Sequence, residues 1–122
     1  MKKRVVITGV GLVTPLGIGG EETWPALCAG KSGIGEITRF DTTRYQTKIA
    51  GEVRGFRNED WLSAKEVNRT ELFIAYAIAA SRMAIEDSGL KINGSNGHRV
   101  GVITGCGLGG LQIMERTIVS VK

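Results

Sequence analysis

The residues with the clearest chemical potential lie in one glycine-rich segment, residues 101–110, which read GVITGCGLGG. Cys106 is a candidate nucleophile, because the N-terminus of a following helix lowers the pKa of a thiol. Gly105, Gly107 and Gly110 also fit the G-x-G-x-x-G pattern of a dinucleotide-binding turn. A third interpretation is structural, with glycines that permit close backbone approach and a cysteine that is a small residue in a crowded turn.

Both chemical interpretations lack a partner residue. A cysteine nucleophile needs a base, and the single histidine, His98, precedes the expected strand, where we expect it to be solvated. A dinucleotide site needs an acidic residue about 20 residues after the glycines, and Glu115 comes too early. We therefore interpret Cys106 as a small turn residue and place Cys28 in the core. Dinucleotide binding stays as the weaker alternative.

The glycine segment is nearly a repeat of an earlier one. Residues 6–12 read VITGVGL and residues 102–108 read VITGCGL. In both copies a short β-branched run precedes the glycines, a pattern typical of a strand buried in a parallel sheet. We predict strands over residues 5–8 and 100–104, each ended by a glycine turn.

The strongest helical pattern covers residues 64–88 and is ended by Gly89. Its apolar arc is wide and rich in alanine, which predicts a buried helix that packs closely against its neighbours. The other predicted elements are a helix over residues 21–29 that contains Pro25 and stops at Gly30, an edge strand within residues 48–53, and a helix over residues 111–121. The last helix reaches the chain end without a stop signal, which predicts that the natural protein is longer.

Charge and composition exclude several classes of protein. The 122 residues carry 16 Lys and Arg against 12 Asp and Glu, a net charge of +4, and the basic residues form no stripe of the kind that binds nucleic acid. No apolar stretch approaches the ~20 residues of a membrane span. The two cysteines form neither a disulfide framework nor a metal site, which favours the reducing cytoplasm. The first residues mimic a secretory signal, but glycines and Pro15 interrupt the apolar run.

Five segments together resemble one known family. They are RVVITGVGLVTPLG at the start, AGKSGI after the first helix, RFDTTRYQTKIAGEV, EDSGL at the end of the long helix, and RVGVITGCGLGGL. In this order they are similar to the amino-terminal portion of a type II β-ketoacyl-[acyl-carrier-protein] synthase. TPLG and GCGLGG, with a bulky apolar Leu108, resemble the type II long-chain elongating enzymes more than type I.

The resemblance implies an α/β thiolase-like fold, with two βαβαβαβ halves stacked as layers α-β-α-β-α in a homodimer. Residues 1–122 would form the first part of the first half. The implied activity is fatty acid elongation, in which an acyl group on a cysteine condenses with malonyl-[acyl-carrier-protein] after decarboxylation aided by two histidines. These three catalytic residues would lie outside this chain, so we expect residues 1–122 alone to be inactive. We expect no metal and no cofactor beyond the phosphopantetheine of the carrier protein.

The resemblance also assigns roles to two groups of residues. The residue matching Leu108 is an acyl-pocket gate, so Gly107, Leu108, Gly109 and Leu111 would form a movable apolar lining. Lys65 and Arg69 match basic residues that meet the acidic acyl carrier protein, although Asn68 replaces another basic residue often present there. The alternative for Lys65 and Arg69 is an ordinary solvated face. For the whole chain, the alternative within the family is a non-catalytic partner similar to a chain-length factor.

Overall fold

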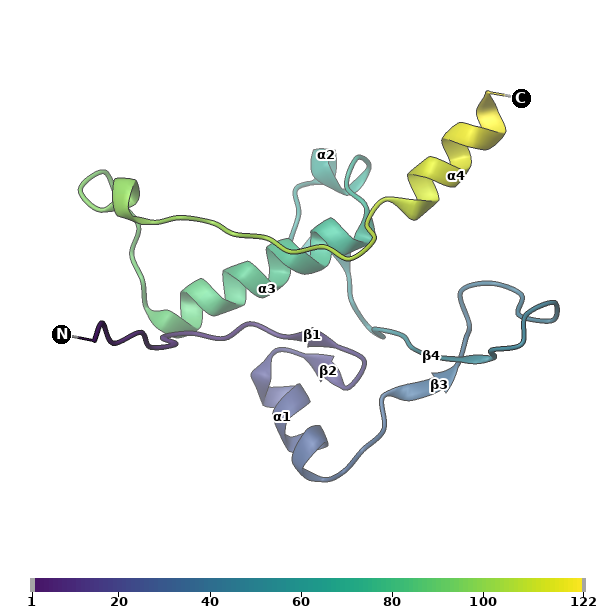
Figure 1. The fold of residues 1–122 in the computed structure, drawn as a ribbon, viewed down its shortest axis with the longest axis horizontal. Helices are drawn as coiled ribbons and strands as arrows, with labels where there is room; N and C mark the ends of the chain where they lie inside the picture. Colours follow the sequence, from purple (N-terminus) through teal and green to yellow (C-terminus); the bar gives the residue numbers. More distant parts are fainter. Residues whose placement is uncertain (1, 122) are drawn as a thin grey trace.

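The long helix α3 is the scaffold around which the other segments lie (Figure 1). A computed structural model describes residues 2–121. Its elements are β1 (Val13–Thr14), β2 (Gly17–Ile18), α1 (Gly20–Cys28), β3 (Ile34–Glu36), β4 (Ile49–Gly51), the 3-10 helix η1 (Asn58–Asp60), α2 (Ala64–Val67), α3 (Leu72–Ser88), the 3-10 helix η2 (Gly97–Arg99) and α4 (Leu111–Ser120). Among these helices none is long and apolar enough to cross a bilayer.

The alanines of α3 let neighbouring segments approach its backbone. Ala75 and Ala79 are fully buried, because a methyl side chain leaves room for another chain to pack directly on the helix. Gly89 ends α3 in the left-handed conformation with φ 64°, and its N–H bonds to the carbonyl of Glu86. The predicted close packing at alanine and the predicted stop at Gly89 are confirmed. The predicted burial of the helix as a whole is wrong for the described residues, because Ala75 and Ala79 are its buried residues and Phe73, Ile74 and Ile85 are exposed.

The N-terminal segment packs on the second half of α3 through two glycines. A Cβ at Gly11 would overlap the carbonyl oxygen of Ala80 and lie 2.8 Å from the nitrogen of Ala84. A Cβ at Gly9 would overlap the carbonyl of Ala84 and lie 2.6 Å from the nitrogen of Ser88. Glycine is therefore required at both positions by backbone contact with the helix, independently of its own dihedral angles.

A hairpin follows and leads into α1. Strands β1 and β2 pair antiparallel, with Val13 opposite Ile18. The hydroxyl of Thr23, a buried residue of α1, donates to the carbonyl of Gly17 at 3.1 Å. The sequence predicted α1 and its stop correctly, since the helix contains Pro25 and ends just before Gly30. The hairpin itself was not predicted.

Strands β3 and β4 form a second antiparallel hairpin, whose β4 lies within the predicted edge strand. An aromatic contact connects this region to α3. The rings of Phe56 and Tyr76 meet edge to face with centroids 4.7 Å apart, and Arg39 Nη2 donates to the hydroxyl of Tyr76 at 3.2 Å. The loop of the hairpin and the segment that follows β4 are therefore joined to the second turn of α3.

The predicted parallel strands over residues 5–8 and 100–104 are wrong for the described residues. Both segments run extended in the same direction, opposite to α3 (Figure 1), but neither is a strand, and both sheets within residues 2–121 are antiparallel hairpins. Ile7 is 86% exposed and Ile103 99%. A β-branched run favours an extended backbone, but a strand also needs a partner that completes its hydrogen-bond ladder, and residues 2–121 supply none.

The predicted single helix over residues 64–88 is also wrong, because it is divided into α2 and α3. Asn68 ends α2, and Glu71 has the extended backbone angles φ −71° and ψ 156° immediately before α3. An extended residue breaks the series of i to i−4 hydrogen bonds, so the second helix must begin anew. Ser63 and Glu66 form a capping box that supports the short first helix.

We predict that Gly11→Ala destabilises the intact protein by about 2 kcal/mol or more, because the added methyl group meets helix backbone that cannot rotate away. The free energy of unfolding from urea titration measures this loss. Gly94→Ala is the matched control, since its added Cβ would meet no heavy atom within 4 Å. Equal changes in the two variants would contradict the proposed contact between the N-terminal segment and α3.

Candidate functional site

The glycine-rich segment crosses the start of α3 just before α4 (Figure 1). A Cβ at Gly109 would lie 2.6 Å from Cε2 of Phe73 and 2.8 Å from the sulfur of Cys106. Gly110 follows in the left-handed conformation with φ 78° and immediately precedes α4. The contacts at Gly109 support the structural interpretation at that position. The rest of the predicted crowding is wrong for the described residues, because Cys106 is exposed and an added Cβ at Gly105 or Gly107 would meet nothing within 4 Å.

The four residues expected to form the gate lie together at this turn. Leu108 is 73% exposed and Leu111 59%. A Cβ at Gly107 would meet nothing within 4 Å, so the chain has free space on one side of Leu108 and the Phe73 ring beside Gly109. The structure brings the four residues into one surface segment, and their role in lining an acyl pocket stays a prediction.

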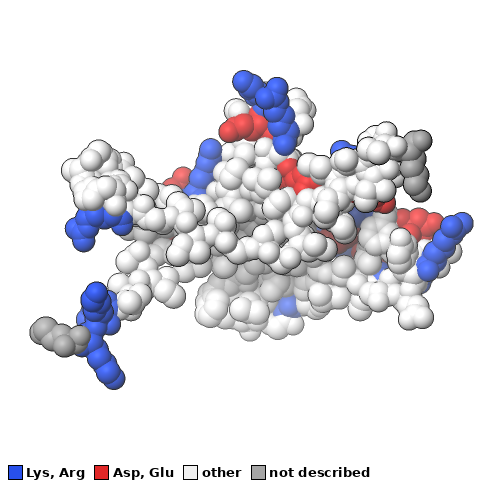
Figure 2. Space-filling model, turned by 45° about the horizontal axis from the view of Figure 1, so that its top comes forward, with Lys and Arg blue, Asp and Glu red and all other residues white. Residues whose placement is uncertain are grey.

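Lys65 and Arg69 also lie close to each other, on and just after α2. Both side chains are exposed, and the N–H of Arg69 bonds to the carbonyl of Glu66 at 2.9 Å. Figure 2 shows that the basic side chains on the visible face form small separate groups with acidic side chains among them. Carrier-protein binding by Lys65 and Arg69 stays a prediction.

The capping box at the start of α2 fixes the backbone that carries Lys65. The N–H and the hydroxyl of Ser63 donate to Glu66 Oε2 at 2.9 and 2.6 Å. Because the hydroxyl and the N–H of Ser63 bond to the charged form, they lower the pKa of the Glu66 carboxyl below its ordinary value, against a small opposing effect of desolvation. The exposed cap is therefore sensitive to acid.

Glu71 connects the two candidate regions and was missed by the sequence analysis. Its Oε1 accepts a hydrogen bond of 3.0 Å from the N–H of Ile113, in the first turn of α4. The interpretation of residues 64–88 as one helix placed Glu71 inside a helix, where it had no special role. Gly110 was the sequence signal that could have indicated such a contact. A helix that begins after glycine has no capping side chain of its own, so a residue from elsewhere can supply the cap.

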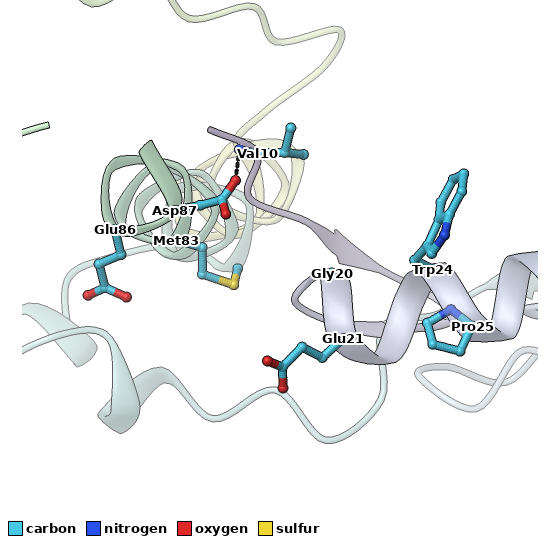
Figure 3. Close-up of a pocket in the computed structure, with 8 residues that line it drawn as sticks. All are labelled: Val10, Gly20, Glu21, Trp24, Pro25, Met83, Glu86 and Asp87. Atoms are coloured by element: carbon cyan, nitrogen blue, oxygen red, sulfur yellow. Dashed lines mark hydrogen bonds between the residues drawn. The ribbon is translucent and has the colours of Figure 1, made fainter. Parts of the chain in front are cut away.

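An open cavity of about 550 Å³ lies away from this turn, between the N-terminal segment, α1 and α3. Figure 3 shows the N–H of Val10 bonded to Asp87 at its edge, at 2.8 Å. Its other lining side chains are the apolar Trp24, Pro25 and Met83 and the acidic Glu21 and Glu86. The Val10–Asp87 bond joins the N-terminal segment to α3, which is a structural role.

The remaining candidate residues stay apart from one another. His98 is exposed, as expected, and Cys106 is exposed as well. The prediction that Cys28 lies in the core is wrong, because Cys28 is exposed at the last position of α1, whereas Thr23 and Ala26 take the buried face of that helix. Within residues 2–121 no three His, Cys, Asp or Glu side chains are grouped to hold a metal ion.

We predict that α2 loses its cap as the pH falls. Glu66 has a lowered pKa in the folded state, so its contribution to stability is complete above the unfolded value of about 4.3 and is lost as the pH falls through the folded value. Hydrogen exchange of residues 64–68, corrected for intrinsic rates, should show protection above about pH 5 that disappears at lower pH.

Glu66→Gln should remove this pH dependence, because an amide does not titrate. Glu59→Gln is the control, a change of the same kind at an exposed position of η1. If exchange in Glu66→Gln changed with pH as it does in the unmodified protein, the cap would not depend on the charge of Glu66.

Comparison with known families gives a match over almost the whole chain. Residues 2–120 match the family described as "Beta-ketoacyl synthase, N-terminal domain". The chain is 49% identical over 114 residues to the 3-oxoacyl-[acyl-carrier-protein] synthase 2 of Vibrio cholerae, and 49% identical over 115 residues to that of Coxiella burnetii. These matches cover 93% and 94% of the chain, and the chain spans 28% of the length of either relative.

A solved structure gives a similar result. The chain superimposes with a TM-score of 0.67 and 40% identity on the structure described as "The ishigamide ketosynthase/chain length factor". The match covers 75% of this chain and 23% of that one. The expected thiolase-like α/β class is therefore confirmed, and the family match is evidence against the alternative of a dinucleotide-binding domain.

Proposed function

The chain belongs to the β-ketoacyl synthase family, and from this membership we propose that it is part of a 3-oxoacyl-[acyl-carrier-protein] synthase II that elongates acyl chains in fatty acid biosynthesis. The observation that carries the proposal is the identity of 43–49% to relatives of that name over almost the whole chain. The bulky apolar Leu108 among glycines agrees with it, since the family resemblance implies an acyl-pocket gate at this position.

The proposed reaction is a decarboxylative Claisen condensation. The bond between the α-carbon and the carboxylate of the malonyl thioester breaks and releases carbon dioxide. The electron pair left on the α-carbon forms a new bond to the carbonyl carbon of an acyl group held on a cysteine. The bond from that carbon to the cysteine sulfur then breaks, which returns the thiolate and leaves 3-oxoacyl-[acyl-carrier-protein]. The cysteine and the two assisting histidines belong to parts of the enzyme beyond residues 1–122.

These residues would serve the reaction by binding and gating. Lys65 and Arg69 are exposed next to each other on the chain segment before α3, where they can attract an acidic carrier protein. The phosphopantetheine of that protein carries the substrates, and no other cofactor is proposed. Leu108 projects between two glycines and can move without displacing a neighbouring strand. We place the intact enzyme in the cytoplasm as a homodimer.

A non-catalytic partner similar to a chain-length factor is the second candidate. The observation behind it is the likeness to a solved structure whose description names both a ketosynthase and a chain-length factor. Both candidates share the fold, and they differ in whether the intact protein has the nucleophilic cysteine.

Purified intact protein tests the proposal directly. Incubation with acyl-[acyl-carrier-protein] and malonyl-[acyl-carrier-protein] should release carbon dioxide and form the 3-oxoacyl product in equal amounts. An acyl thioester on the protein, detected by intact mass, should precede the product. Absence of both the thioester and the product would support the non-catalytic partner instead.

We predict that Leu108→Phe in the intact enzyme obstructs long acyl chains before short ones. The phenyl ring of phenylalanine is larger than the leucine side chain and should block the deepest part of the pocket, where only long primers extend. The expected shift in relative kcat/KM is about 1–3 kcal/mol between the longest and the shortest primers, measured by acylation across a series of primers. Leu90→Phe is the control, since Leu90 is an exposed leucine at the far end of α3. Equal slowing of all primers would mean that Leu108 contributes packing alone.

We predict that the double variant Lys65→Glu and Arg69→Glu raises the KM for carrier-linked substrates by about tenfold, because reversed charges repel an acidic partner and slow its association. The KM for a small thioester without the carrier protein should stay the same. Steady-state kinetics with both substrates measures the difference.

Lys91→Glu with Arg99→Glu is the control for net charge, since it makes the same change at exposed positions beyond the end of α3. A similar rise of KM in the control, or equal losses on both kinds of substrate, would assign Lys65 and Arg69 to an ordinary solvated face.

A further inference from the structure

Glu71 occupies a position between two helices. It is the residue before α3, where a side chain ordinarily accepts a hydrogen bond from the first turn of its own helix. The Glu71 side chain makes no such bond. Only its backbone carbonyl serves α3, accepting from the N–H groups of Ile74 and Ala75 at 3.0 and 3.1 Å. The half-buried carboxylate is directed elsewhere.

The carboxylate caps α4 instead. The first N–H groups of a helix have no partner within it, and Gly110, the residue before α4, has no side chain to provide one. No acidic residue lies in the first turn of α4 either. Glu71 Oε1 accepts the N–H of Ile113 at 3.0 Å, across 42 positions of sequence. The negative charge at this helix end is also favourable for the helix dipole.

The same carboxylate lies over the turn that carries the candidate gate. Glu71 Oε2 is 3.5 Å from the position that a Cβ of Gly110 would take. Two residues further along, the ring of Phe73 lies against Gly109. The beginning of α3 therefore holds Gly109 by packing and α4 by a charged hydrogen bond. Leu108 is left as the bulky side chain with free space around it.

We propose that Glu71 is a positioning residue, which fixes the first turn of α4 and thereby limits the displacement of Leu108 during acyl-chain entry. This inference rests on the proposed function of Leu108 as a gate. Glu71 lies only two residues after Arg69, so the segment expected to bind the carrier protein continues directly into the residue that holds the gate. When the cap is lost, the turn should move more freely and select less sharply between chain lengths.

Hydrogen exchange followed by mass spectrometry tests the contact in the intact protein. Glu71→Ala should increase exchange in peptides that span residues 107–116, by about fivefold or more at the first turn of α4, a loss comparable to that of an ordinary helix cap. Glu71→Gln keeps an acceptor oxygen but loses the charge, so its increase should be smaller. Glu86→Ala, an exposed glutamate of the same helix, should leave this region unchanged.

Kinetics of the same variants tests the role in gating. The ratio of kcat/KM between a long and a short primer should move toward one by about threefold to tenfold in Glu71→Ala, and Glu71→Gln should restore much of the original ratio. The KM for the carrier protein should change little in either variant. Equal slowing of all primers, or unchanged exchange at residues 107–116, would overturn the proposal.

The two levels of inference fail in different ways. If the unmodified intact protein forms no 3-oxoacyl product, the proposed function is wrong, and the exchange experiment still decides whether Glu71 caps α4. If the unmodified protein is active and Glu71→Ala keeps either its exchange at residues 107–116 or its chain-length ratio, only the proposed role of Glu71 is wrong.

Discussion

The structure depends on close contact between glycine backbone and the alanine-rich surface of α3. Gly9 and Gly11 lie so near the carbonyl groups of Ala80 and Ala84 that no side chain fits between them. Dispersion forces increase steeply at short separation, so two chains in direct backbone contact hold each other firmly without large apolar side chains. Ala75 and Ala79, on another face of the same helix, are fully buried as well.

The two ends of α3 use different chemistry for the same purpose. Near its end, the carboxylate of Asp87 accepts the N–H of Val10 and joins the N-terminal segment to the helix. At its start, Glu71 accepts the N–H of Ile113 and joins α4. Each bond satisfies a backbone donor of a segment that lacks a partner of its own. One helix thus orients the N-terminal segment and the glycine turn that bears Leu108.

The few residues around Leu108 combine an open side with a supported side. Gly107 is free of neighbours within 4 Å of an added Cβ, whereas Gly109 is closed in by Phe73 and Cys106. A hinge needs a segment that can move and a point that is held in place. Here Gly107, before Leu108, has open space, and Gly109, after it, is held by packing. The gate proposed at Leu108 would need both properties, freedom to move and a fixed support.

The sequence by itself determined the family, the helices α1 and α4, and the stop of α3 at Gly89. It also supplied the candidates for the gate and for carrier-protein binding, whose roles stay predictions. These features depend on local composition and on motifs that need few neighbours. The prediction was wrong for segments whose secondary structure depends on a partner strand. Residues 5–8 and 100–104 have the composition of strands, but within residues 2–121 no neighbouring strand hydrogen-bonds to them.

The repeat shows most clearly what only the tertiary structure decided. Gly9 and Gly11 in VITGVGL pack on α3, whereas Gly105 and Gly107, at the matching positions of VITGCGL, have open space around them. The two copies are almost identical in sequence, so their different roles come from what lies beside them. The same holds for Glu71, whose role is set by an N–H group 42 residues away. A contact between residues distant in sequence depends on how α3 and α4 meet in space, and no local pattern records that geometry.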